Sequence, residues 1–175
     1  MIWDRDERFA MANRIIIKSF AYDNPITYIE HIDVPAHQVR FTEKLAMSRI
    51  IPAHAQKLGK AIRDRGLKLV VFSGSWCKDC QEVIPALAKI CQVTDIPMKI
   101  LGGAKFSQQK PPTWHVPPSP PEMNELNIER IPAILFVDKY GVEVLRYYER
   151  PPAGKSLEQH LLDLVESRVP ARLGT

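Results

Sequence analysis

The sequence predicts an α/β domain with a central mixed sheet flanked by helices, preceded by an N-terminal helical extension. Three observations predict this fold. A buried-strand pattern at 68–73, a helical pattern and a second apolar run at 98–101 are typical of a parallel βαβ unit. Two apolar runs around a turn, between 133 and 148, predict an antiparallel hairpin. An amphipathic helical pattern begins at residue 156.

Length and composition agree with one globular domain. The chain has 175 residues, close to the roughly 150 expected of a domain. Apolar residues make up 45% and charged residues 25%, which excludes disorder across the whole chain, collagen and a coiled coil. No apolar run reaches the roughly 18 residues of a membrane span, so no membrane partner is predicted. The net charge of +4 is small and dispersed, so no nucleic acid partner is predicted.

The N-terminus and the cysteine count predict a cytoplasmic protein. Residues 1–14 are charged throughout, and the apolar run Ile15–Ile17 is interrupted by Lys18. A secretory signal requires a longer apolar stretch. Three cysteines do not make the disulfide framework of a secreted scaffold. The chemistry therefore depends on the close pair Cys77 and Cys80.

The division of the chain is predicted near residue 66. Residues 1–65 contain helical patterns and no convincing chemical motif, so we expect an N-terminal helical extension packed on the core. Residues 66–175 contain every predicted strand and form the second part, with the cysteine pair.

Three helical stretches are expected in the extension. Asn24 before Pro25 predicts an N-cap followed by proline at the first helical position. A second stretch lies between Pro35 and Pro52, and a third ends at Gly66, a C-terminal cap.

The strand Lys68–Ser73 leads directly into the cysteine pair. Gly74 ends this strand, and the segment Trp76–Cys80 opens the next helix. One face of that helix has an apolar stripe, which predicts that the helix packs on a core. The stripe comprises Val83, Ile84, Leu87, Ile90 and Cys91.

The segment 102–121 predicts a long loop beside the cysteines. It holds six of the fifteen prolines, which favours extended conformations. In a right-handed βαβ unit this loop and the cysteine pair follow strands that end at the same edge of the sheet. We therefore expect the loop to border the active site and to help select partners. Trp114 either contacts a partner or pins the loop to the core.

The C-terminal third predicts a hairpin between two helices. A short helix is expected at 122–128, followed by strands at 133–137 and 142–148 that are joined by a turn. Ser156–Gln159 has the pattern of a capping box that opens the last helix, and Pro170 ends that helix.

Cys77 and Cys80 lie three residues apart at the start of a helix, where one turn brings two thiols together. The positive end of the helix dipole stabilises a thiolate at Cys77, and a thiolate is the attacking species in disulfide exchange. Cys77 is therefore the candidate nucleophile, and Cys80 is the less exposed resolving thiol. Lys78 favours the thiolate and Asp79 opposes it, so both are possible modulators whose net effect is open.

Zinc binding is the alternative use of two close cysteines. It usually requires a second ligand pair at a defined spacing. The other candidates are Cys91 and five scattered histidines, none arranged as HxxxH. A CxxC pair after a strand in a βαβ unit points to redox chemistry instead, so no metal and no cofactor is predicted. Cys91 lies about 16 Å further along the helix and is interpreted as a core thiol.

The motif Ser75–Cys80, followed by Pro85, resembles the active site of the thioredoxin superfamily. Ile131-Pro132 resembles the cis-proline loop of that family, and Gly141 falls in the following hairpin turn. The resemblance covers roughly residues 66–169. The Lys-Asp centre is most similar to that of thioredoxin-like proteins with a WCxDC active site.

The resemblance implies substrate-binding roles for Trp76, Ile131 and Pro132. The loop would face the cysteines, the backbone of Ile131 would pair with a substrate peptide, and Trp76 would be the aromatic beside the nucleophile. From the residues alone, Pro132 could simply begin a strand and Trp76 could be a core residue. Thioredoxins carry a buried Asp six residues before the first cysteine. Val71 occupies that position here, which leaves Cys80 without that base.

These residues predict a thioredoxin-like thiol–disulfide oxidoreductase. It would reduce disulfides of protein or small-molecule partners through the Cys77–Cys80 dithiol and be regenerated by an unknown thiol reductant. Asp79 or Glu82 could replace the missing base. The alternative is a non-enzymatic thioredoxin-fold module for interaction or metal binding. A peroxide-handling enzyme of the same fold lacks a visible peroxidatic motif.

Overall fold

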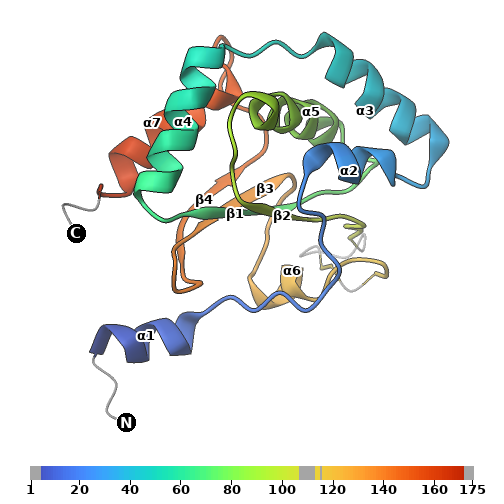
Figure 1. Ribbon diagram of the computed structural model, residues 1–175. Helices are drawn as coiled ribbons and strands as arrows, with labels where there is room; N and C mark the ends of the chain where they lie inside the picture. The colour runs from blue at the N-terminus through green and yellow to red at the C-terminus, as the bar shows by residue number, and fades with distance from the viewer. Residues whose placement is uncertain (1–4, 107–112, 115, 172–175) are drawn as a thin grey trace.

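The computed structural model describes residues 5–106, 113–114 and 116–171 (Figure 1). Within these ranges the chain forms seven helices and four strands. In chain order they are α1 (Arg5–Asn13), α2 (Pro25–Glu30), α3 (Pro35–Met47), α4 (Pro52–Asp64), β1 (Lys68–Phe72), α5 (Lys78–Val93), β2 (Met98–Leu101), α6 (Glu122–Glu125), β3 (Ala133–Val137), β4 (Glu143–Tyr148) and α7 (Leu157–Arg168).

The four strands form one mixed sheet in the order β2-β1-β3-β4. β1 pairs in parallel with β2 and antiparallel with β3, and β3 pairs antiparallel with β4. The predicted βαβ unit and hairpin are both present, so the predicted α/β fold with a mixed sheet is confirmed. The bounds differ slightly: β1 ends at Phe72 rather than Ser73, and α6 ends at Glu125 rather than at residue 128.

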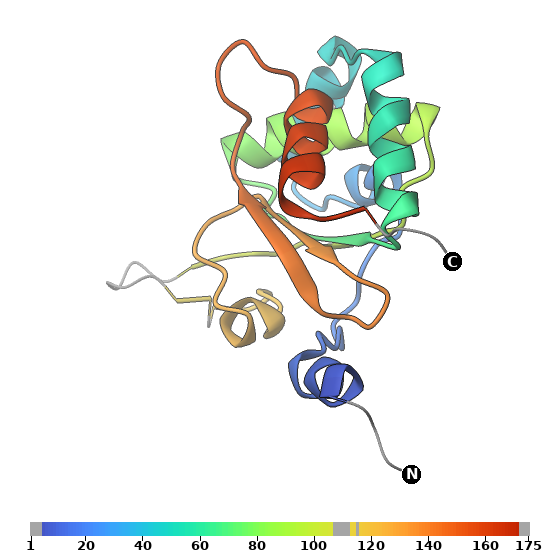
Figure 2. The same ribbon diagram turned by 90° about the vertical axis from the view of Figure 1, so that its left-hand side faces the viewer.

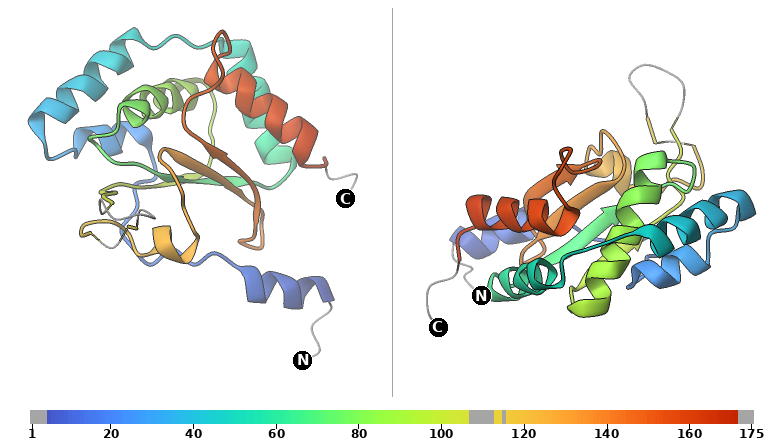
Figure 3. Two further views of the ribbon diagram at one scale, coloured as in Figure 1. Left: turned by 180° about the vertical axis from the view of Figure 1, so that it is seen from behind. Right: turned by 90° about the horizontal axis from the view of Figure 1, so that it is seen from above.

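Helices cover both faces of the sheet. α4, α5 and α7 lie on one face, and α6 lies on the other (Figures 1 and 2). Seen from above, α5 lies between α4 and α7 on one side and α2 and α3 on the other (Figure 3). The predicted stripe of α5 faces the core, because Ile84, Leu87 and Ile90 are fully buried. Cys91 is only half-buried, so it lies at the margin of the core rather than inside it.

The chain before α2 runs along the α6 side of the sheet (Figure 1). The backbone N–H of Ile15 donates to the carbonyl of Gly141 in the hairpin turn at 2.7 Å. Ser19 then donates to Glu122 of α6, with 2.6 Å between Oγ and Oε1. Tyr22 forms an isolated antiparallel bridge to β2, after which α2 and α3 pack against α5. The division of the chain near residue 66 stays a prediction.

Side-chain caps explain where two of the helices begin. Asn24 caps α2 as predicted, because its Oδ1 accepts a hydrogen bond from the Ile26 N–H at 2.7 Å. At α7 only half of the predicted capping box forms. Ser156 Oγ accepts from the Gln159 N–H at 3.4 Å, while the Gln159 side chain donates forward to Asp163 at 2.9 Å. In the described part of the chain no helix is long and apolar enough to cross a membrane.

Candidate active site

The two close cysteines lie where β1 leads into α5. Cys77 is the N-cap of α5, so its sulfur accepts a hydrogen bond from the Cys80 N–H at 3.3 Å. The Cys77 thiol in turn donates to the carbonyl oxygen of Ile131 at 3.6 Å. Both thiols are free. Cys77 is 8% exposed and Cys80 is fully buried, so Cys80 is the less exposed of the two, as expected.

The pKa of Cys77 lies below the ordinary value of a thiol. The largest cause is a hydrogen bond from the Cys80 thiol, and the backbone N–H groups of Cys80 and Asp79 act in the same direction. Burial and the negative charge of Asp79 raise the pKa of Cys77 and only partly offset these bonds. Asp79 therefore opposes the thiolate, and the net direction, which the sequence left open, favours it. Lys78 is exposed.

The pKa of Cys80 lies well above the ordinary value of a thiol. Burial is the largest cause, because it penalises the charged form, and Cys77 raises it further. Hydrogen bonds from the Gly74 backbone and the Ser73 hydroxyl lower the pKa of Cys80 and partly offset burial. Cys77 is therefore the thiol of this pair that ionises first.

The predicted substrate-binding residues come from the segment of Cys77 itself and from the loop before β3. The peptide bond between Ile131 and Pro132 is cis, and the Ile131 carbonyl faces the Cys77 sulfur. Trp76 is 38% exposed, and its indole N–H donates to the carbonyl of Ala104 at 2.6 Å. The structure thus brings the Ile131 carbonyl of the loop before β3 to the Cys77 sulfur, while the Trp76 indole N–H is bonded to Ala104 in the loop after β2.

The loop after β2 borders this site. Phe106 contacts the ring of Trp76 on one side and the ring of Trp114 on the other, with centroid distances of 5.5 and 5.6 Å. Trp114 is 5% exposed and donates its indole N–H to the Ile128 carbonyl at 2.5 Å. Trp114 therefore pins the loop to the core, and the interpretation as a partner contact is wrong. Phe106 is 42% exposed instead. Residues 107–112 and 115 of the predicted loop lie outside the described residues.

Three polar contacts at the site were missed by the sequence analysis. His37 Nδ1 of α3 lies 2.8 Å from Ser75 Oγ, and Gln81 Nε2 donates to the Ser75 carbonyl at 3.0 Å. The Tyr28 hydroxyl of α2 lies 3.0 Å from Ser73 Oγ. His37 and Tyr28 lie far before the cysteines in the sequence, and no motif spacing connects them to the cysteine pair. The single available signal was Ser73, a polar residue at the end of an apolar run.

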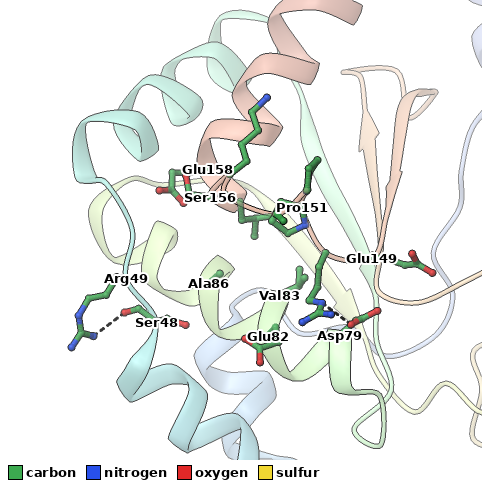
Figure 4. Close-up of a pocket in the computed structure, with 16 residues that line it drawn as sticks. Ser48, Arg49, Asp79, Glu82, Val83, Ala86, Glu149, Pro151, Ser156 and Glu158 are labelled. Atoms are coloured by element: carbon green, nitrogen blue, oxygen red, sulfur yellow. Dashed lines mark hydrogen bonds and ion pairs between the residues drawn. The ribbon is translucent and has the colours of Figure 1, made fainter.

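The two carboxylates considered as replacement bases are engaged in ion pairs. Asp79 pairs with Arg150 at 2.9 Å, an ion pair drawn as a dashed line at Asp79 in Figure 4, and Glu82 pairs with Lys44 of α3 at 2.6 Å. Both pairs lie toward the surface rather than at the buried Cys80 sulfur. The sequence-based suggestion that either one serves Cys80 gains no support from these contacts.

Open pockets flank the start of α5 on two sides. A pocket of about 660 Å³ lies between Asp79, Glu82 and the segment 149–158, and its lining is charged (Figure 4). A more apolar pocket of about 560 Å³ lies beside Trp76 and Phe106, with His37 and Val34 on its other wall. The second pocket adjoins the exposed aromatic residues next to Cys77.

Among the residues that the structure describes, no group of three or more His, Cys, Asp or Glu side chains could hold a metal ion. Two of the histidines in the N-terminal part instead form hydrogen bonds: His37 with Ser75, and His31 Nδ1 with the Thr27 carbonyl at 2.8 Å.

Comparisons with known proteins bear on the family and the fold of the chain. A family model described as thioredoxin matches residues 27–105. A crystal structure of a protein of unknown function from Pseudomonas aeruginosa is 20% identical, covers 82% of this chain and 89% of its own, and has a TM-score of 0.50. Thioredoxin from Aeropyrum pernix is 17% identical over 60% of this chain and 77% of its own, with a TM-score of 0.36. A DsbH oxidoreductase is 19% identical over 54% and 68%, with a TM-score of 0.33.

These matches bear on fold and family. No curated protein matches the chain. The family model and the mixed sheet support the thioredoxin superfamily, and the fold is a thioredoxin-like α/β fold. The likeness to the Pseudomonas protein concerns the fold alone. The family match begins at residue 27 and therefore includes most of α2, all of α3 and α4, and the cysteine pair.

Proposed function

We propose that this chain is a thiol–disulfide oxidoreductase that reduces disulfides through Cys77 and Cys80. The observation that carries the proposal is the unequal environment of two adjacent thiols. Cys77 accepts hydrogen bonds at a helix N-terminus, which lower its pKa, and Cys80 is buried, which raises its pKa. Such a pair separates an attacking thiolate from a thiol held in reserve.

The proposed reaction takes place in two exchanges. The Cys77 thiolate attacks one sulfur of a partner disulfide, the partner's S–S bond breaks, and one partner thiolate leaves. Cys80 then attacks the Cys77 sulfur, so that the second partner thiol leaves and a Cys77–Cys80 disulfide remains. The proton lost by Cys80 balances the charge of the departing thiolate. An external thiol reductant returns two electrons and two protons to the pair.

The surroundings of Cys77 support a protein or peptide substrate. Trp76 and Phe106 offer exposed aromatic surface beside the sulfur, and the apolar pocket extends from them. In this proposal the backbone at Ile131 and Pro132 aligns the substrate chain across the sulfur, as the family resemblance implies. The partners are disulfide-containing proteins or small disulfides, and we place the reaction in the cytoplasm.

An insulin reduction assay with dithiothreitol as the electron source tests the proposal. Cys77→Ser should abolish turnover, because exchange requires its thiolate. Cys80→Ser should accumulate mixed disulfides through Cys77, detectable by mass spectrometry. Cys91→Ser is the matched control, and it should retain nearly full activity. Turnover that persists in Cys77→Ser would show that the nucleophile is assigned wrongly.

A chelator and a potential measurement separate the remaining alternatives. If the cysteines bind metal, a chelator should change the thermal unfolding temperature, and the purified protein should carry metal. The reduction potential of the Cys77–Cys80 couple decides the direction of electron flow. A value near or below that of the glutathione pool supports a reductase, and a far more oxidising value supports a disulfide donor.

A further inference from the structure

Arg150 reaches the first turn of α5 from the segment that follows β4. Its Nε atom lies 2.9 Å from Oδ1 of Asp79. Asp79 comes two residues after Cys77, whose side chain caps the same turn of the helix. A positive charge from a distant part of the chain is thus placed beside the carboxylate that lies nearest in sequence to the proposed nucleophile.

The residue before Arg150 anchors this segment to the loop before β3. The Glu149 N–H donates to the Pro132 carbonyl at 2.9 Å, and the Glu149 carboxylate pairs with Arg130 at 3.4 Å. Glu149 has a φ of 67°, a left-handed conformation that is uncommon for residues other than glycine. Its side chain points away from Asp79 (Figure 4). Two consecutive side chains therefore reach different partners, one in the loop before β3 and one at the start of α5.

Other charged and titratable groups surround Cys77 and Asp79. They are Lys78, Cys80 and Glu82 of α5, Tyr28 of α2, His37 and Lys44 of α3, Arg130 of the loop before β3, Tyr147 of β4 and Glu149 after β4. Lys44 pairs with Glu82, and Arg130 pairs with Glu149. Burial raises the pKa of both tyrosines, so both are neutral near pH 7. Among the described residues, Arg150 is therefore the cation that is paired with Asp79.

The Asp79 carboxylate is the charge on which this ion pair acts. Its negative charge raises the pKa of Cys77, because a like charge disfavours a thiolate. A guanidinium at 2.9 Å offsets part of that charge, and arginine stays protonated at every pH at which a thiol titrates. The Asp79 side chain is 34% exposed and that of Arg150 is 61% exposed, so the effect is modest and sensitive to salt.

We propose that Arg150 is a positioning residue that keeps Cys77 reactive by neutralising the Asp79 carboxylate. This inference rests on the proposed function, because it concerns the nucleophile of that reaction. In this role Arg150 exchanges no proton and transfers no group. It lowers the cost of the negative charge that the Cys77 sulfur carries before it attacks. A residue far outside the motif thus offsets the acidic residue within it.

Alkylation of Cys77 tests this role without requiring disulfide exchange. In a Cys80→Ser, Cys91→Ser background Cys77 is the one remaining thiol. At a pH below the pKa of Cys77, Arg150→Gln should slow alkylation by the uncharged reagent iodoacetamide roughly threefold, because the Asp79 charge is left without its partner. The two rates should converge above about pH 9, where an ordinary thiol is largely ionised. Arg150→Lys keeps the positive charge and should retain most of the parent rate.

Lys155→Gln is the matched control. Lys155 lies in the same segment after β4 and lines the same charged pocket, but it pairs with Asp163 of α7 at 2.5 Å. This variant therefore removes the same charge without touching Asp79, and it should leave the pH profile of Cys77 unchanged. About 1 M sodium chloride should shrink the effect of Arg150→Gln, because salt screens exposed charges. A loss of structure would persist in salt.

A double-mutant cycle asks whether Arg150 acts through Asp79. Asp79→Asn alone should speed alkylation at a pH below the pKa of Cys77, because it removes the opposing charge. In that background Arg150→Gln should have little further effect. An undiminished effect would overturn the inference, since Arg150 would then act on Cys77 by another route.

The remaining outcomes separate this inference from the proposed function. Identical pH profiles for Arg150→Gln and its parent would overturn the inference, as would an equal shift in Lys155→Gln. Reduction of the uncharged disulfide dithiodipyridine by the Cys91→Ser protein, in which Cys77 and Cys80 are intact, reports the proposed function. If this disulfide is not reduced while Arg150→Gln slows alkylation as expected, the proposed function fails and the effect of Arg150 on Cys77 stands.

Discussion

A hydrogen bond from the Cys80 thiol is the largest cause of the lowered pKa of Cys77. A pair of substitutions can measure the effect of this side-chain hydrogen bond separately. Cys80→Ala removes the side-chain donor, whereas Cys80→Ser keeps a hydroxyl donor at the same place. Both variants retain the backbone N–H that donates to the Cys77 sulfur at 3.3 Å. A difference between them therefore reports the side-chain hydrogen bond alone.

The size of that difference follows from hydrogen-bond energetics. A hydrogen bond to a charged group contributes about 1.5–3 kcal/mol, and the lower end applies because the hydroxyl of Cys80→Ser sits on a shorter bond than the thiol and approaches the Cys77 sulfur less closely. About 1.4 kcal/mol corresponds to a tenfold change in an ionisation equilibrium. At a pH below the pKa of Cys77, the alanine variant should therefore hold about ten times less thiolate than the serine variant.

Alkylation by iodoacetamide measures this thiolate directly. In a Cys91→Ser background Cys77 is the sole thiol of either variant. A lowered pKa places more thiolate at low pH, so removal of the donor should slow alkylation near pH 5–6. The two rates should converge above about pH 9, where even an ordinary thiol is largely ionised. Superimposable pH profiles would refute the reasoning and assign the lowered pKa of Cys77 to the backbone N–H groups.

Two further predictions concern stability and the third thiol. Phe41 of α3 is fully buried and packs edge-on against Tyr28 at 5.9 Å, so Phe41→Ala should lower the free energy of unfolding by about 3–5 kcal/mol. Val39→Ala on the exposed side of α3 should change it by less than about 0.5 kcal/mol; equal losses in urea unfolding would contradict the packing of α3. Burial, with a smaller effect of Asp95, raises the pKa of Cys91 to about 11, so about one molecule in a thousand is thiolate at pH 8. Mass spectrometry after brief alkylation should find Cys77 labelled long before Cys91, and equal labelling would contradict that pKa.

The sequence predicted features that neighbouring residues encode. Asn24 before Pro25 correctly indicated the start of α2, and the apolar run at 68–73 correctly indicated a buried strand, which ends one residue earlier at Phe72. It could not decide between the two roles of Trp114, because burial of that ring depends on how Ile128 and the α6 segment cover it. Half of the predicted capping box at α7 does not form, because the Gln159 side chain donates to Asp163 one turn ahead instead.

Contacts between distant segments were beyond sequence reasoning, and they decide how the active-site loop is held. Trp76 donates to the carbonyl of Ala104, and a Cβ atom at Gly74 would lie 2.7 Å from that same oxygen. Glycine at this position therefore lets the loop after β2 approach the start of α5 closely.

The N-terminal helices α2 and α3 contact the segment between β1 and α5, which leads to the cysteine pair. His37 of α3 contacts the Ser75 hydroxyl, and Tyr28 of α2 contacts the Ser73 hydroxyl. Both contacts cross the predicted division near residue 66, so the segment before it supplies a side-chain partner to each serine that flanks Gly74. Loss of α2 and α3 would leave the Ser73 and Ser75 hydroxyls without these partners. The helices before the predicted division therefore help to hold the segment that leads into the cysteine pair.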